Sequence, residues 1–249
     1  MISRVFKAFR RVSEISHQWL LALRQFLELR NQSNPRFSLQ WRDRWLCLRD
    51  ATTKTGFDRH YVFHTAWACR VLAESRPSEH VDISSSLYFV ATVSAFIPVS
   101  FYDYRPAELN LSRLDCKAAD LTRLHFADCS IASLSCLHVV EHIGLARYGD
   151  PLDYNGDLKA VSELCRVLAI NGQLLFVVPI GGVARIQFNA HRIYTYRQVL
   201  EMFHGFELVE FSLIPDENSK FGLIRNAHEG LANDQHYGCG CFWFRKVKA

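Results

Sequence analysis

The sequence lacks an apolar run long enough to cross a bilayer, which takes about 18 residues with few charges. Its best candidate, Trp19 to Leu29, is interrupted by Arg24 and Glu28. The stretch Leu20 to Leu23 is too short for a secretory signal, and no small-residue cleavage site follows it. We therefore expect a cytoplasmic protein without a spanning helix.

Paired cysteine spacings are also missing. The eight cysteines fall mostly inside apolar segments, and Cys239 and Cys241 form the one close pair, which is typical of small core residues in a reducing compartment. Low-complexity sequence is absent too. With 49% hydrophobic, 13% aromatic and 22% charged residues among 249, the chain can bury a core, which excludes a disordered or collagen-like protein.

Positive charge is concentrated in the first 50 residues, which hold ten Lys and Arg against four Asp and Glu. We therefore divide the chain into a basic extension, residues 1–50, and a main domain, residues 51–249. In the extension, apolar residues recur every three or four positions from Ile2 to Leu27, which predicts one amphipathic helix. This helix either lies on an anionic membrane as a peripheral contact or packs on protein, its own domain or a second copy in a homo-oligomer. The apolar weight around Trp19 favours packing on protein.

From about residue 56 the pattern alternates between helix and strand, which predicts an α/β fold with a mostly parallel sheet. The last two strands are expected to be antiparallel, because no convincing crossover helix lies between them. The expected helices are 61–72, 87–96, 158–168 and 196–203. The expected strands are 80–83, 98–102, 114–119, 133–140, 173–179, 206–214 and 241–247, with a turn at Asn171-Gly172 before the fifth.

Three acids stand where the first three strands end: Asp82, Asp103 and Asp120. The carboxyl ends of parallel strands form the usual ligand crevice of such sheets, and an acid after the second strand suits a ribose diol. Each acid alone could equally cap a turn. Their succession favours a binding site.

Longer strings in this region resemble known proteins. The acids followed by SLSCLHVVEHI, DLKAVSELCRVLAI and NGQLLFVVP resemble class I S-adenosylmethionine-dependent methyltransferases. More narrowly, HVVEHIGLARYGDPLDYNGDLKAVSELCRVL and FNAHRIYTYRQVL are similar to a bacterial and animal family known as domain of unknown function 268. The resemblance covers about residues 56–249 and is tightest from Asp120 to Tyr196.

The resemblance implies a Rossmann-like methyltransferase fold with a seven-stranded sheet and S-adenosylmethionine as cofactor across the first four strands. Asp82 with the serine turn would hold the amino-acid end of the cofactor, and Asp103 the ribose. Asp120 with Leu121 would hold the adenine, and His138 would form a wall of the pocket.

The turn after the first strand departs from the superfamily's pattern. A glycine normally lets the backbone approach the ligand there, but this chain has Ser84, Ser85 and Ser86. If the first position needs a positive φ, serine strains the backbone by about 1 kcal/mol or more. The serine in place of glycine therefore predicts weaker binding of the cofactor. It leaves the alternative that the fold has lost its cofactor. It also disfavours a dinucleotide oxidoreductase, which needs the glycine more strictly.

His138, Glu141 and His142 spell H-x-x-E-H, a zinc motif when both imidazoles share one helical face. Here His138 ends a strand and Gly144 follows closely, so this motif lacks its helix and we assign no metal ligand. His142 is either a general base or a buried, hydrogen-bonded histidine.

A second polar group, Asn189, His191, Arg192 and Tyr194, follows the fifth strand on the same rim of the sheet. His191 could accept a proton from an acceptor hydroxyl, while Asn189, Arg192 and Tyr194 would bind substrate. Alternatively, local hydrogen bonds simply pin this loop.

These features together predict a methyltransferase that acts on a hydroxyl of a small molecule or saccharide. The alternative is a methyltransferase-like fold that binds or scaffolds without catalysis. The closing run Phe242 to Lys248 mixes aromatic and basic residues, but it is more simply a final core strand, and no RNA-binding module is visible.

Overall fold

A computed structural model describes residues 2–32, 34–216 and 221–248 of the chain, with side chains from Ile15 onward. The chain divides into two compact units, Met1–Phe57 and Asp58–Ala249. Each unit is described by itself below.

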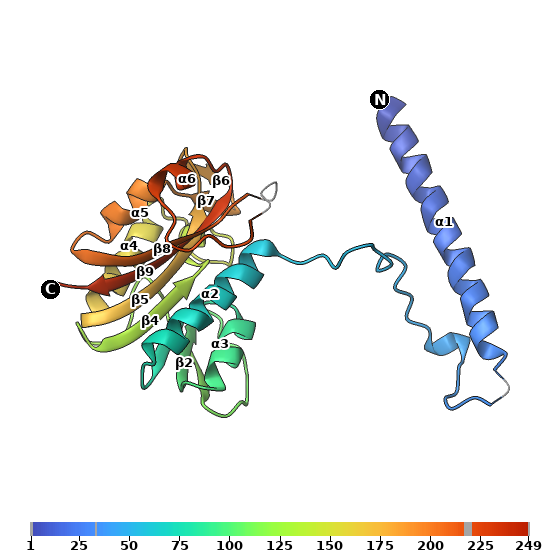
Figure 1. Cartoon of the computed structure of the whole chain (residues 1–249), viewed down its shortest axis with the longest axis horizontal. Helices are drawn as coiled ribbons and strands as arrows, with labels where there is room; N and C mark the ends of the chain where they lie inside the picture. Colours follow the sequence, from blue (N-terminus) through green and yellow to red (C-terminus); the bar gives the residue numbers. More distant parts are fainter. Residues whose placement is uncertain (1, 33, 217–220, 249) are drawn as a thin grey trace. The chain divides into compact units, whose positions relative to one another are not determined.

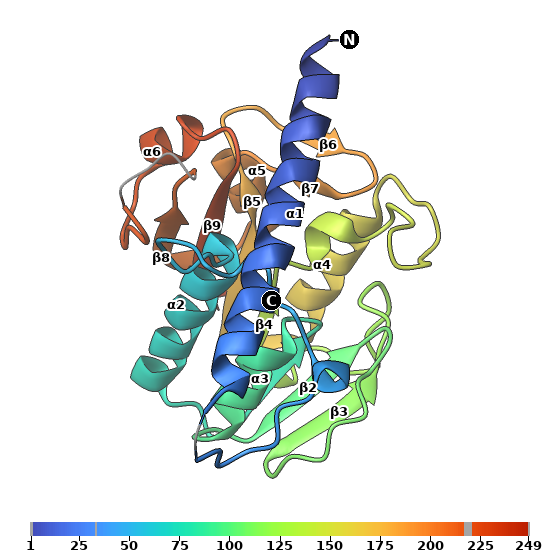
Figure 2. The ribbon, with the colours of Figure 1, turned by 90° about the vertical axis from the view of Figure 1, so that its right-hand side faces the viewer.

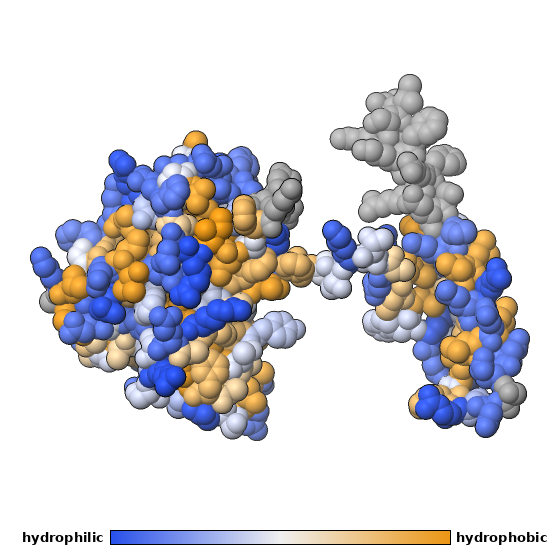
Figure 3. All heavy atoms as spheres, in the orientation of Figure 1, coloured by the Kyte–Doolittle hydropathy of each residue, from blue (hydrophilic) through white to orange (hydrophobic). Residues whose placement is uncertain are grey.

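The first unit contains one long helix, α1 (Ile2–Arg30), and a short turn, η1 (Trp41–Asp43) (Figure 1). The predicted helix is confirmed, and apolar and polar residues are interspersed along its described part (Figure 3). The apolar stripe up to residue 12 falls outside the described side chains. At the other end of α1, the Phe26 ring packs edge-on against Trp41, with 4.9 Å between ring centroids. Within the described residues, no helix has the length and apolarity that a membrane span needs.

The second unit is built on a seven-stranded sheet in the order β3-β2-β1-β4-β5-β9-β8. Strands β1 to β5 pair in parallel, and β9 runs antiparallel to both β5 and β8. The predicted fold class is confirmed. The bounds are β1 (His80–Ile83), β2 (Val99–Asp103), β3 (Leu114–Ala118), β4 (Ile131–Leu137), β5 (Leu168–Ile180), β8 (Phe206–Ile214) and β9 (Gly238–Lys246).

Helices cover both faces of this sheet, with α2 (Arg59–Ser75) and α3 (Leu87–Ser94) on one face and α4 (Gly156–Val167) and α5 (Tyr196–Met202) on the other (Figures 1 and 2). A hydrophobic core lies on each face of the sheet, and successive residues of β5 pack into the two cores in turn. Leu175 packs in the cluster of α2 and α3, whereas Phe176 packs in the cluster of α4 and α5. This alternation explains why β5 is apolar without a break from Leu174 to Ile180, since side chains of a strand point to opposite faces in turn.

Local capping decides where several helices begin. The Asp58 carboxylate accepts from the N–H of Tyr61 at the start of α2, and Ser86 does the same for Phe89 at the start of α3. Thr195 and Gln198 form a reciprocal capping box at α5. Each cap satisfies a backbone donor that has no partner inside its helix.

Three details differ from the sequence-based expectations. β5 begins at Leu168 rather than after the predicted turn, because Asn171 adopts a φ of 63° and the ladder with β4 continues across an irregularity. The loop after β5 contains a hairpin of β6 (Arg185–Gln187) and β7 (His191–Ile193), and a short helix α6 (Glu229–Asn233) precedes β9. All eight cysteines are free. Cys136, Cys239 and Cys241 are buried as expected, but Cys47 and Cys129 are exposed.

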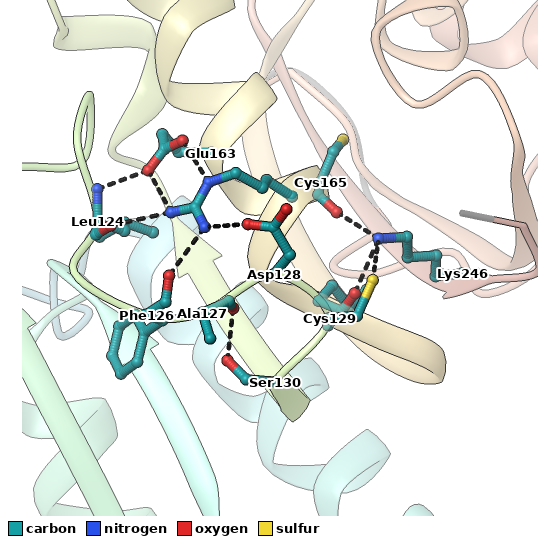
Figure 4. A network of polar contacts seen from close by, with 11 residues as sticks. Leu124, Phe126, Ala127, Asp128, Cys129, Ser130, Glu163, Cys165 and Lys246 are labelled. Carbon is teal, nitrogen blue, oxygen red and sulfur yellow. Dashed lines mark hydrogen bonds and ion pairs between the residues drawn. The ribbon is translucent and has the colours of Figure 1, made fainter.

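A polar network ties the segment before β4 to α4 and β9 (Figure 4). The Arg166 guanidinium donates to the carbonyl of Phe126 at 2.8 Å and to Asp128 at 2.6 Å. The Lys246 ammonium, on a buried side chain, donates to the carbonyls of Cys165 at 2.8 Å and Leu168 at 2.9 Å. These carbonyls lie where α4 ends and β5 begins, so Lys246 satisfies backbone acceptors that α4 leaves open.

Replacing Lys246 by methionine should lower the free energy of unfolding by about 1–3 kcal/mol, because the stem still packs while buried carbonyls lose their donor. Urea denaturation of the two proteins measures the difference. Lys248→Met is the matched control, since Lys248 is exposed on the same chain end. Equal losses in both variants would contradict this role of Lys246.

Candidate functional site

The carboxyl ends of β1, β2 and β4 and the segment after β3 converge on one cavity of about 530 Å³. This volume lies within the range typical of small-molecule sites. Six of the residues predicted as cofactor-binding line it: Ser84, Ser86, Asp103, Asp120, Leu121 and His138. His142, predicted as catalytic, lines it as well.

The serine turn has the backbone geometry that glycine normally provides. Ser84 has a φ of 56°, in the left-handed region, and its N–H donates to the carbonyl of Tyr102 at 2.7 Å. Ser85 and Ser86 complete the turn, and Ser86 caps α3. The turn therefore has the left-handed conformation that favours glycine, and it carries a Cβ at this strained first position.

Asp82 occupies a different place from the one the sequence suggested. Its side chain is completely buried and does not line the cavity. One carboxylate oxygen accepts from the N–H of Ser85 at 3.0 Å, and the other accepts from the hydroxyl of Ser135. Asp82 therefore holds the turn from behind and joins β1 to β4, rather than standing where a ligand could reach it.

A buried chain of hydrogen bonds continues from Asp82 along the face of the sheet that α2 covers. Ser135 bonds one ring nitrogen of His80 at 2.8 Å, and Ser133 bonds the other at 2.8 Å. Gln173 then donates to Ser133 at 3.0 Å. Burial lowers the pKa of His80 to about 3, so its neutral ring donates at one nitrogen and accepts at the other.

The other two strand-end acids remain accessible at the cavity. Asp103 is partly exposed, and one of its oxygens accepts from the N–H of Arg105 at 2.7 Å. Asp120 accepts from both the N–H and the hydroxyl of Thr122, at 2.8 and 2.7 Å. Leu121 beside it is buried. Asp120 thus caps its own turn while Leu121 supplies an apolar wall.

Glu141 lies buried at the centre of the H-x-x-E-H segment. It accepts from the Nδ1–H of His138 at 2.7 Å, while its second oxygen has no partner among the described residues. Burial alone would raise its pKa, but the adjacent His138 and His142 rings outweigh burial and lower it. The segment forms only a short turn, η2 (Val140–His142), so the helical zinc motif is absent here, as the sequence suggested.

His142 is held at the cavity by its backbone-facing nitrogen. Its Nδ1–H donates to the carbonyl of Ala190 at 2.6 Å, and Arg147 donates to the same carbonyl at 2.9 Å. The neutral ring then carries its acceptor lone pair on Nε2. Burial lowers the pKa of His142 despite the neighbouring Glu141, which keeps the ring unprotonated at neutral pH.

The second polar group lies outside the cavity lining. Arg192 is buried and donates to the carbonyls of Ile143 at 2.6 Å and Tyr154 at 2.9 Å. The Tyr194 hydroxyl donates to Asp157 at 2.9 Å. The sequence left two interpretations of this group, substrate binding or a loop held by local hydrogen bonds. Arg192 and Tyr194 fit the second.

His191 and Asn189 also stand outside the lining. The His191 ring stacks on Tyr237, with 5.1 Å between centroids, and its Nε2 is buried without a partner among the described residues. Burial lowers its pKa. Its ring centroid is 6.2 Å from that of His142, so of the two predicted catalytic histidines only His142 reaches the cavity.

Sequence reasoning missed several residues of this region. Tyr61 on α2, Tyr148 in the loop before α4 and Lys159 on α4 line the cavity. His60 on α2 lies beside His138, with 5.4 Å between stacked rings. Burial lowers the pKa of His60 to about 4. The helix 61–72 was predicted, but no sequence signal placed its beginning beside the end of the fourth strand.

Comparisons with known proteins agree with this geometry. The model of one family, described as Caenorhabditis protein of unknown function, DUF268, matches residues 123–237. The predicted resemblance is confirmed. A search of the curated proteins gave no match.

Solved structures show the same fold at low identity. The N-methyltransferase NodS from Bradyrhizobium japonicum, in complex with S-adenosylhomocysteine, is 13% identical with a TM-score of 0.53, over 90% of this chain and 98% of its own. The 1,6-didemethyltoxoflavin-N1-methyltransferase of Burkholderia thailandensis is 12% identical with a TM-score of 0.53, over 74% and 79%. YcgJ of Bacillus subtilis is 12% identical with a TM-score of 0.51, over 76% and 100%. The chain has the Rossmann-like methyltransferase fold.

The buried Asp82 predicts an unusual pH dependence of stability. Burial raises its pKa from 3.8 to about 7, and the hydrogen bonds from Ser135 and Ser85 oppose this only in part. The folded state therefore binds a proton more readily than the unfolded state between about pH 4 and 7, and the stability that this proton contributes is lost as the pH rises through 7.

Asp82→Asn should flatten this decline in the free energy of unfolding between pH 4 and 7, whatever its effect on absolute stability. Urea denaturation at half-unit pH steps gives the two slopes. Asp115→Asn, at an exposed position on β3, should keep the wild-type slope. An unchanged slope in Asp82→Asn would contradict the raised pKa.

Proposed function

We propose that residues 58–249 bind S-adenosylmethionine in this cavity and transfer its methyl group to a hydroxyl of a small molecule or saccharide. The observation that carries the proposal is the convergence of the serine turn, Asp103 and Leu121 on one cavity of about 530 Å³. Three successive strand ends thus supply a tight turn, an exposed carboxylate and an apolar wall. The solved structures with this fold, two of them with bound S-adenosylhomocysteine, support the choice of ligand.

Each residue has a role that its position allows. The backbone of the turn from Ser84 to Ser86 would hold the amino-acid end, and Asp82 would keep that turn in place from behind. The Asp103 carboxylate would accept from the ribose hydroxyls. Asp120 and Leu121 would bind the adenine edge and face.

When bound, the cofactor supplies an electrophilic methyl group on a sulfonium. The protein then has to position the acceptor and remove its proton, and positioning supplies most of the rate in such transfers. Nε2 of His142, a residue that lines the cavity, would accept that proton, and the Glu141 carboxylate 3.7 Å away would stabilise the protonated ring. The lowered pKa of His142 keeps this nitrogen available at neutral pH.

Calorimetry with S-adenosylmethionine and S-adenosylhomocysteine tests the cofactor directly. Asp103→Ala should weaken S-adenosylhomocysteine binding by about 1–3 kcal/mol, because a charged hydrogen-bond acceptor is lost. Asp128→Ala is a control, since Asp128 belongs to the network with Arg166 and does not line the cavity. If the wild type gives no heat of binding at millimolar ligand, the proposed methyltransferase activity is refuted. The alternative, a methyltransferase-like fold that binds or scaffolds without catalysis, would then stand.

The serine turn generates a separate prediction. Ser84→Gly should tighten binding while changing stability little, because glycine adopts the φ of 56° freely but gains entropy in the unfolded chain. Ser86→Gly should not tighten binding, since Ser86 has a negative φ of −68° and caps α3. Calorimetry gives affinity and urea denaturation gives stability. Weaker binding in Ser84→Gly would show that the hydroxyl itself contacts the ligand.

A further inference from the structure

Three potential metal ligands from distant parts of the sequence meet around His138, which lines the cavity. They are His60 at the start of α2, His138 after β4 and Cys239 on β9. One ligand atom from each lies within 4.8 Å of the other two. The closest pair, Nε2 of His138 and Sγ of Cys239, is 3.3 Å apart.

We propose that His60, His138 and Cys239 bind a Zn²⁺ ion, with His64 as the fourth ligand. Imidazole nitrogens and thiolate are the ligands that zinc prefers. Tetrahedral zinc with bonds of about 2.0–2.1 Å to nitrogen and 2.3 Å to sulfur separates those atoms by about 3.6 Å. The pair of His138 and Cys239 is already close to that spacing, so little movement is needed.

The orientation of His138 supports its role as a ligand. Its Nδ1–H donates to the buried Glu141 carboxylate at 2.7 Å, which leaves the lone pair on Nε2, facing the sulfur of Cys239. A carboxylate behind a histidine is the usual arrangement around zinc, because it fixes the tautomer and makes the ring a better ligand. In the metal-free state the Cys239 thiol can donate its proton to Nε2, and the ion would replace that proton.

Unpartnered groups around the three ligands favour a cation. His64, one helical turn after His60, is completely buried, and neither of its ring nitrogens has a partner among the described residues. Its ring centroid is 5.0 Å from that of His138. The second oxygen of Glu141 is also buried without a partner. Buried polar groups are normally satisfied, and an ion at this point would bind His64 directly and balance the Glu141 charge.

This site differs from the zinc motif that the sequence spells. In the H-x-x-E-H motif both His138 and His142 would coordinate, but here His142 donates from Nδ1 to the carbonyl of Ala190. Two of the four proposed ligands come from α2 and one from β9, outside the motif. The proposal also does not depend on cofactor binding, because zinc can be measured with no S-adenosyl ligand present.

The test uses the full-length chain, dialysed against a chelator and then titrated with zinc chloride. We expect one zinc per chain by elemental analysis. In competition with a chromophoric chelator, Glu141→Gln should weaken binding by about 10–100-fold, as loss of a carboxylate behind a ligand does. Cys239→Ala and His64→Gln remove ligands and should weaken binding at least as much. Cys241→Ala, equally buried two residues along β9, should bind zinc as the wild type does.

X-ray absorption at the zinc edge tests the wild type without any substitution. The expected first shell contains one sulfur at about 2.3 Å and nitrogens at about 2.0–2.1 Å. Substoichiometric zinc in the wild type, a shell without sulfur, or equal affinity in Cys239→Ala would overturn the site. Equal affinity in His64→Gln alone would overturn the fourth ligand.

Discussion

The contact between the buried Asp82 carboxylate and its two serines is the constraint on which the candidate site depends. Ser85 and Ser135 bind opposite oxygens of Asp82, so one side chain fixes both the turn after β1 and the pairing of β1 with β4. The Ser85 hydroxyl in turn accepts from the N–H of Leu137, the last residue of β4. Because β4 leads directly into His138, the same contact positions the histidine side of the cavity. A carboxyl group that no solvent reaches thus organises a site that it does not enter.

A second buried carboxylate, Glu141, organises the side chains on this histidine side. It orients His138 and lies near His142, so this wall of the cavity and the proposed base share one anchor. Burial opposes its ionisation and the adjacent imidazoles favour it, and the imidazoles prevail. The two carboxylates therefore differ in kind. Asp82 has only neutral hydroxyl and amide donors and keeps a raised pKa, whereas Glu141 lies among rings that can carry positive charge.

Much of the fold could be predicted from sequence because each element carries a local signal. The apolar run of β5 and the helical stripe of α4 determine their own type, and the expectation of a seven-stranded sheet followed from the resemblance. The site was less predictable, because burial depends on neighbours that are distant in sequence. Asp82 and Arg192 were both expected to meet a ligand, yet partners from β4 and from the loop before α4 occupy them. Nothing local distinguishes such an acid from Asp103.

The residues that sequence analysis missed share one cause. His60 and His64 stand four residues apart on α2. Nothing in the sequence around them distinguishes them from other residues of an apolar helix. Their significance comes only from the first turns of α2 lying beside the end of β4 and the beginning of β9. There His60 meets His138 and Cys239, His64 lies beside His138, and His138 belongs both to the cavity wall and to the proposed zinc site. Because His138 belongs to both, a metal that fixed its ring would also fix the edge of the cavity nearest to His142. The histidine cluster and the cavity are therefore best understood as one polar core, built where β4 ends and where α2 and β9 begin.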